Sequence, residues 1–261
     1  MILAGINPLY SVAGLAIGTL VGLTGVGGGS LMTPLLVLLF NFHPVTAVGT
    51  DLLYASATKS VGTGVHGFNR TVDWRVVRLL AIGSVPATVL TLVVLGYAGR
   101  HYGGMVEVVT IVLGLTLIAT AIAMLFRTQI VRRIAPAIAA LSTRRIATLT
   151  ITLGVLLGVL VSLTSVGAGA IGMTALLALY PHLPTNRLVG SDIAHAVPLT
   201  LIAGIGHWAM GAVDFGLLGS LLIGSVPGIV IGSLLSARVP DGVLRAILAV
   251  TLFVVGTKLL F

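Results

Sequence analysis

The feature that most constrains the fold of this chain is an internal repeat. Four short motifs of the first half return in the same order in the second half. LTGVGGG at Leu23 returns as LTSVGAG at Leu163, a spacing of 140 residues. The other three motifs return after 141 residues. VGTD at Val48 returns as VGSD at Val189, and the pair His66 and Asp73 returns as His207 and Asp214. GSVP at Gly83 returns unchanged at Gly224. The repeat predicts two similar units, residues 1–126 and 146–261, joined by a linker at 127–145.

The composition places both units in a lipid membrane. Of the 261 residues, 57% are hydrophobic and only 8% are charged, and the mean hydropathy is +1.17. Soluble domains carry about 25% charged residues. The apolar runs are long and the charges lie between them, which favours membrane-spanning helices. The alternating segments that a membrane β-barrel needs are absent. We therefore expect an all-α, polytopic integral membrane protein.

Each unit divides into five apolar segments. Because this number is odd, the second unit must enter the membrane from the side opposite to the first. The sequence therefore predicts inverted-topology repeats. The expected segments are 9–23, 28–41, 47–67, 74–97 and 104–126 in the first unit, and 146–163, 168–180, 188–209, 215–236 and 241–260 in the second.

The basic residues of equivalent loops agree with inversion. The loop around Asp73 is flanked by three arginines, whereas the equivalent loop around Asp214 has no Lys or Arg. Cytoplasmic loops carry the excess of Lys and Arg. This rule puts the linker 127–145, with its five arginines, in the cytoplasm and both chain termini outside. The first ten residues lack a positive n-region and a cleavage site, so no signal peptide is expected.

Several classes of function find no support in the sequence. The net charge of +8 comes from short loops between apolar segments, where topology alone requires it, so we expect no nucleic-acid partner. Cysteine is absent, which excludes disulfides and thiolate metal sites. The six His and the six acidic residues are scattered and form no HExxH motif, so we expect neither an enzyme nor a cofactor or metal.

The two glycine-rich breaks are the first candidate site. Segments of about 14 residues reach roughly 21 Å, less than a hydrocarbon core of about 30 Å, which predicts half-helices that meet inside the membrane. Free amides at the helix starts would then hold an anion, although glycine can also serve helix packing. The candidate residues are Thr24, Gly25, Gly27, Gly28, Gly29 and Ser30 in the first break, and Thr164, Ser165, Gly167 and Gly169 in the second.

Ionisable residues inside apolar segments form the second candidate set, because their burial is costly unless they serve a function. Lys59 has no charged counterpart, since Thr200 aligns with it. We interpret Lys59 as an anion contact or as part of a structural ion pair. Polar support or proton coupling is expected from Thr50, Asp51, Ser191, Asp192 and His195, with helix capping by the two aspartates as the alternative.

These motifs resemble those of the TauE/SafE sulfite exporter family. The similar stretches are LTGVGGGSLMTPLL, HPVTAVGTDLLYA, HGFNRTVDW, GSVPATV and GSDIAHAVPLTLIAGIGH. The resemblance implies a secondary transporter of the cell inner membrane that moves sulfite, sulfonates or related oxyanions. Its glycine-rich breaks correspond to Gly25 and Gly27–Gly29, and to Gly167 and Gly169. Ser165 and Ala168 replace glycines of the first break, so the first break is expected to contribute more to the site.

We therefore expect a carrier for a small sulfur-containing oxyanion that exports it by alternating access. A passive anion channel, a carrier for another small anion, and a purely structural membrane partner are the alternatives. Protons and a second copy of the chain are further candidate partners. Neither the identity of the anion nor the direction of transport follows from the residues themselves.

Overall fold

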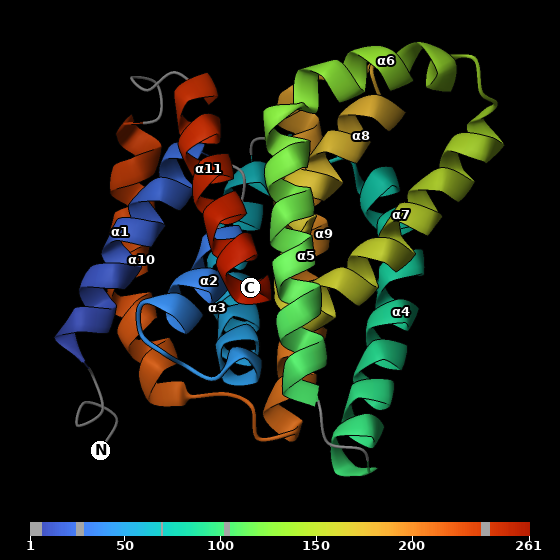
Figure 1. The fold of residues 1–261 in the computed structure, drawn as a ribbon. Coiled ribbons are helices and arrows are strands. Elements are labelled where there is room, and N and C mark those ends of the chain that lie inside the picture. Colours follow the sequence, from blue (N-terminus) through green and yellow to red (C-terminus); the bar gives the residue numbers. More distant parts are fainter. Residues whose placement is uncertain (1–6, 25–28, 69, 102–104, 236–240) are drawn as a thin grey trace.

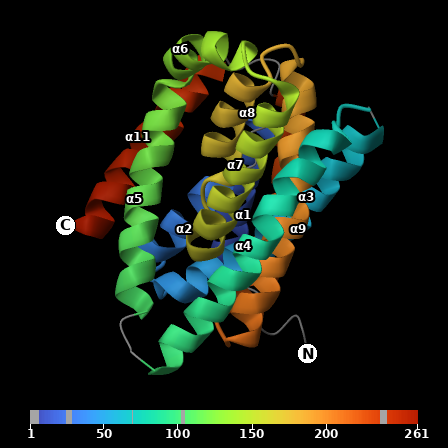
Figure 2. The same cartoon turned by 90° about the vertical axis from the view of Figure 1, so that its right-hand side faces the viewer.

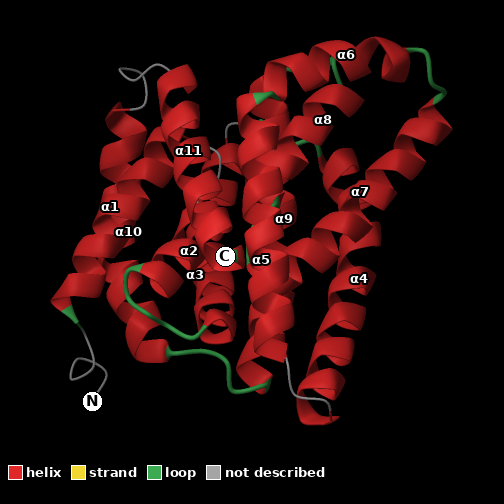
Figure 3. Ribbon diagram, viewed as in Figure 1, coloured by secondary structure: helices red, strands yellow, loops and turns green. Residues whose placement is uncertain are grey.

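The fold is known from a computed structural model, which describes residues 7–24, 29–68, 70–101, 105–235 and 241–261. All regular elements in these ranges are helices (Figure 3). The first unit contains α1 (Pro8–Thr24), α2 (Gly29–Leu38), α3 (Pro44–Phe68), α4 (Trp74–His101) and α5 (Met105–Leu125). After α6 (Arg127–Ala139), the second unit contains α7 (Thr143–Thr164), η2 (Ala168–Gly172), α8 (Met173–Leu179), α9 (Thr185–Ala209), α10 (Phe215–Leu235) and α11 (Asp241–Leu260).

Five of these helices are long and apolar enough to cross a membrane: α4, α5, α7, α9 and α10. Helix α3 has 25 residues, which at about 1.5 Å per residue is also a sufficient length. It is less apolar because it carries Asp51, Lys59 and His66 along its length. The all-α, multi-pass membrane class expected from the composition is therefore confirmed.

The linker holds an element that the sequence analysis did not predict. Residues 127–139 form helix α6, and none of its side chains is buried. In Figure 1, α6 lies across one end of the molecule and joins α5 to α7. Ile130, Ile134 and Ile138 follow one another at spacings of four, while Arg132 and Arg133 lie exposed between them. This pattern is typical of an amphipathic helix at a membrane surface.

Equivalent helices of the two units make reciprocal pairs. Helix α1 packs along α10, and its counterpart α7 packs along α4 (Figures 1 and 2). Helices α3 and α9 pack against each other, as do α5 and α11. Each partner therefore comes from the other unit, so the two units interlock along their length.

Glycines allow the paired backbones to touch. A Cβ atom added at Gly83 of α4 would lie 2.0 Å from the carbonyl oxygen of Ile151 in α7. At the equivalent Gly224 of α10, it would lie 1.8 Å from the carbonyl oxygen of Ser11 in α1. Small residues at such crossings are typical of membrane helices, where close van der Waals contact drives association.

Equivalent helices run in opposite directions. In Figure 1, α1 rises from the end of the molecule near the N-terminus, whereas its counterpart α7 descends from α6 at the other end. Helix α5 likewise rises to α6, while α11 descends to the C-terminus. Together with the reciprocal pairs, these directions support the expectation of inverted repeats.

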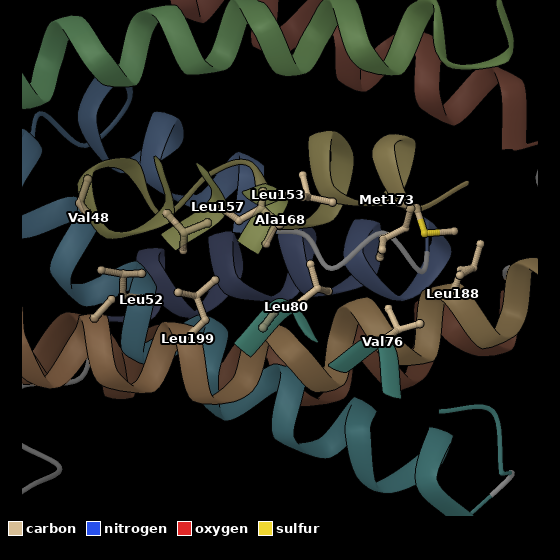
Figure 4. Packing of buried hydrophobic residues seen from close by; sticks show 14 of the residues in the cluster. Val48, Leu52, Val76, Leu80, Leu153, Leu157, Ala168, Met173, Leu188 and Leu199 are labelled. Carbon is tan, nitrogen blue, oxygen red and sulfur yellow. The ribbon is translucent and has the colours of Figure 1, made fainter. Parts of the chain in front are cut away.

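The largest buried apolar cluster lies where both units meet. It brings together Leu52 of α3, Leu80 of α4, Leu157 of α7 and Leu199 of α9, all of them fully buried (Figure 4). Ala168 of η2 belongs to the same cluster. The core therefore holds the second glycine-rich break in place from several helices.

Candidate functional site

The second break is a buried turn between α7 and η2. Ser165 adopts a left-handed conformation with φ 59°, and Gly167 has φ 117°, which favours glycine. The Thr164 hydroxyl accepts a hydrogen bond of 3.1 Å from the Val166 N–H and lies 2.7 Å from the Leu160 carbonyl oxygen. The sequence analysis lists Thr164 as a candidate residue for anion binding. In the structure its hydroxyl donates to a backbone carbonyl and so closes the turn.

A π-helical turn, η2, follows the break. The N–H of Gly172 donates to the carbonyl oxygen of Gly167 at 3.0 Å, the five-residue spacing of a π-helix. Such a turn accommodates one inserted residue. It lies where the repeat spacing changes from 140 to 141, because Met32 and Thr33 already correspond to Met173 and Thr174. The predicted Gly169 lies buried inside η2.

The expectation of paired half-helices needs correction in the second unit. Helix α7 has 22 residues, or about 33 Å, and is long enough to span the membrane alone. The segments after each break are short: α2 has 10 residues, and η2 and α8 have 5 and 7. The sequence analysis underestimated α7 because it begins at Thr143, inside the polar linker.

The predicted residues of the first break fall largely outside the described structure. The described part of helix α1 ends at Thr24, and that of α2 begins at Gly29. The predictions for Gly25, Gly27 and Gly28 lie outside the described residues, and so do the side chains of Thr24 and Ser30. The site is therefore built here from α2, α3, the second break and α9.

Asp51 joins α2 to α3. Its Oδ2 atom accepts a hydrogen bond of 2.5 Å from the Thr33 hydroxyl and another of 3.2 Å from the Thr33 N–H. Helix α3 begins at Pro44, two turns before Asp51, so Asp51 does not cap the helix start. The sequence analysis missed Thr33, although the recurrence of Met-Thr at 32–33 and 173–174 was a usable signal.

Lys59 lies within electrostatic range of both aspartates of the repeat, Asp51 and Asp192. Its side chain is buried, with 8% exposure. Ser165 of the second break lies close to Asp51. The structure thus brings together four of the predicted site residues, which come from the second break, α3 and α9.

His195 lies one turn after Asp192 on α9. Its Nε2 atom is hydrogen bonded to Ser84 Oγ of α4 at 2.8 Å. Repeat equivalence relates this pair to Tyr54 and Ser225, which also lie close together. Tyr54 and Ser84 were not predicted, because a hydroxyl in an apolar helix carries no distinctive pattern.

The cluster contains buried polar atoms that have no hydrogen-bond partner among the described residues. Buried polar atoms are nearly always hydrogen bonded, so each such atom requires an explanation. A ligand with acceptor oxygens would supply a partner for the Ser165 hydroxyl, whereas the two carboxylate oxygens require a donor such as a proton or a water molecule. The atoms concerned are Asp51 Oδ1, Ser165 Oγ, Asp192 Oδ1 and His195 Nδ1.

Thr50 and Ser191 each accept a hydrogen bond from the backbone of the other unit. The Thr50 hydroxyl accepts a hydrogen bond from the N–H of Asp214 at 3.0 Å, just before α10. The Ser191 hydroxyl accepts the equivalent bond from the N–H of Asp73 at 2.8 Å, just before α4. Both residues therefore join the two units to each other, which is a form of polar support, and a part in proton coupling stays a prediction for them.

A multi-pass membrane protein with a buried ammonium and two buried carboxylates has the features of a transporter, since charges inside the membrane mark pathways for substrates or ions. The profile of the sulfite exporter TauE/SafE family matches residues 10–259. The chain belongs to this family.

Two curated relatives carry names of the same kind. The chain is 40% identical over 250 residues to "Probable membrane transporter protein YjnA" of Bacillus subtilis (strain 168), which covers 95% of this chain and 97% of the relative. It is 27% identical over 216 residues to "Probable membrane transporter protein YdhB" of the same organism, with 80% and 82% covered. No solved structure shows significant similarity. Family and relatives together indicate a membrane transporter and not an enzyme.

Proposed function

We propose that this protein is a secondary transporter that exports a small sulfur-containing oxyanion, sulfite or a sulfonate, across the cell inner membrane by alternating access. One observation carries the proposal: Lys59 is buried within electrostatic range of Asp51 and Asp192, and Ser165 of the second break lies close to Asp51. The family description adds sulfite as the substrate class.

The groups around Lys59 suit an oxyanion. Its ammonium offers up to three charge-assisted hydrogen bonds, which are roughly twice as strong as neutral ones. The hydroxyl of Ser165, which lies close to Asp51 and has no hydrogen-bond partner among the described residues, is a further donor. A tetrahedral or pyramidal oxyanion has several acceptor oxygens and could use these donors together.

The fold supports alternating access as the mechanism. Inverted repeats give a carrier two related conformations in which each unit exchanges roles with the other. The pairs α1 with α10 and α4 with α7 form two equivalent blocks on either side of the central α3 and α9. Rocking of these blocks about the cluster would expose Lys59 first to one side of the membrane and then to the other.

Flux into proteoliposomes tests the proposal. We expect saturable uptake of radiolabelled sulfite or methanesulfonate by the wild type, and at least a tenfold loss in Lys59→Thr, which installs the residue of the second unit. Lys258→Thr is the matched control, because Lys258 is an exposed lysine near the end of α11.

Three results would contradict the proposal. One is wild-type flux of neither anion, and another is equal flux in both lysine variants. The third is the appearance of unitary currents in planar bilayers, which would identify an anion channel.

A further inference from the structure

The two equivalent aspartates of the repeat have different surroundings. Asp51 is held by both the hydroxyl and the N–H of Thr33. No hydrogen bond from Thr174, the counterpart of Thr33, reaches Asp192 among the described residues. Asp192 Oδ1 instead faces Gly172, where an added Cβ would lie 3.0 Å away, and it has no hydrogen-bond partner in the described part of the chain. Thr33 therefore holds the Asp51 carboxylate through two hydrogen bonds, whereas the Asp192 carboxylate has no equivalent donor among the described residues.

The charged and titratable groups near Asp192 come from α3, α6 and α9. Lys59 from α3 and Arg127 from the start of α6 both act on its carboxylate electrostatically. His195 lies one turn further along α9, and Asp51 lies on α3 within range of the same Lys59.

Among the described side chains of the other elements packed against α9, none is a further charged neighbour of Asp192. Segments η2 and α8 contain no titratable residue. Arg75 and Arg78 of α4, and Arg144 and Arg145 of α7, lie exposed near the first turns of their helices. Asp192 is thus a buried acid within electrostatic range of Lys59, as Asp51 is.

We propose that Asp192 is the proton site of the transporter: its carboxylate compensates Lys59 while the substrate is absent, and it takes up one proton when the anion binds Lys59. This inference rests on the proposed function. The buried cluster holds one ammonium and two carboxylates, so an incoming anion adds negative charge that the low-dielectric interior does not tolerate unpaired. Protonation of Asp192 restores the balance, and it ties movement of the anion to movement of a proton in the same direction.

Asp51 is not equivalent in this role. Two donors from Thr33 stabilise its charged form, since hydrogen bonds to ionised groups are the stronger ones. Protonation of Asp51 would remove the charge that strengthens both hydrogen bonds from Thr33. The matched control for Asp192→Asn is Glu107→Gln, which makes the same change from carboxylate to amide at an exposed acid in the first turn of α5, outside the cluster.

Proton uptake on sulfite binding tests the inference. Purified protein in weak buffer with a pH indicator is titrated with sulfite, and binding is followed by calorimetry. Any protons that sulfite itself exchanges cancel when two samples are compared. We expect the wild type to take up about one proton per bound anion more than Asp192→Asn, whereas Glu107→Gln matches the wild type. Equal uptake in the wild type and Asp192→Asn overturns the inference.

A second measurement uses the wild-type protein alone. With methanesulfonate, which stays ionised throughout, linkage requires the Kd of the wild type to rise up to tenfold per pH unit where one proton accompanies binding. A Kd that is constant from pH 6 to pH 9 overturns the inference while leaving the proposed function intact. A wild type that binds neither sulfite nor methanesulfonate contradicts the proposed function itself.

Discussion

The Ser191 hydroxyl accepts a hydrogen bond of 2.8 Å from the backbone N–H of Asp73, 118 residues earlier in the chain. The equivalent bond, from the N–H of Asp214 to Thr50, spans 164 residues in the other direction. Both Ser191 and Thr50 are fully buried. Each bond fixes the start of a helix, α4 or α10, that then packs along a helix of the opposite unit. These reciprocal bonds therefore stabilise the register between the two units.

Removal of either hydroxyl should weaken this register. Ser191→Ala and Thr50→Val each leave a half-buried N–H without its acceptor, which costs about 1 kcal/mol. We expect a lower unfolding temperature for both variants in detergent, with effects of similar size. The control is Thr148→Val, because the exposed Thr148 hydroxyl bonds only within its own helix. An unfolding temperature equal to that of the wild type in both buried variants would disprove this role.

The crossings of α10 with α1 and of α4 with α7 should not tolerate a methyl group. Gly224→Ala and Gly83→Ala place a Cβ against a backbone carbonyl, which cannot move away as a side chain would. Overpacking typically costs about 1–3 kcal/mol. Gly219→Ala is the matched control on α10, since nothing lies within 4 Å of its added Cβ. Fluorescence-detected size exclusion after heating measures the difference, and equal survival of Gly224→Ala and Gly219→Ala would contradict it.

Gly167 should be needed both for stability and for anion binding. Its φ of 117° is one that L-residues rarely adopt, so Gly167→Ala strains the second break. Gly211→Ala is the control, because its φ of 75° lies in the turn after α9, far along the chain from the break. We expect both variants to unfold at lower temperature, but only Gly167→Ala to lose sulfite affinity. Equal Kd values for the two variants would show that the break does not shape the site.

Thr33→Val should weaken the contact between α2 and α3, although valine and threonine have nearly the same size. The substitution removes the hydroxyl that donates to Asp51 and leaves a buried carboxylate with a single donor from Thr33. We expect a loss of about 1–3 kcal/mol in the free energy of unfolding. Thr33→Ser keeps the hydroxyl and should lie close to the wild type. Hydrogen exchange of the α2 amides measures the effect, and unchanged exchange in Thr33→Val would refute it.

Much of the fold follows from the sequence. Apolar length, loop charge and the spacing of 140 or 141 residues predict the membrane class and the helix positions, because each is a local property of the chain. The expected segments 215–236 and 241–260, for example, match α10 (Phe215–Leu235) and α11 (Asp241–Leu260). Lys59, Asp51 and Asp192 stood out for a similar reason, since charge in an apolar run is visible without any contact.

Only the tertiary structure decided how these residues meet. Hydrogen bonds between distant helices depend on their rotation and tilt, which packing sets. Examples are the bond from Thr33 to Asp51, the bond between Ser84 and His195, and the reciprocal bonds accepted by Thr50 and Ser191. A sequence period fixes which face of a helix is apolar, but contacts between distant helices depend on the whole set of close crossings. For that reason the repeat predicted two equivalent aspartates, whereas the fold alone distinguished Asp51, which Thr33 holds, from Asp192, which has no equivalent donor among the described residues.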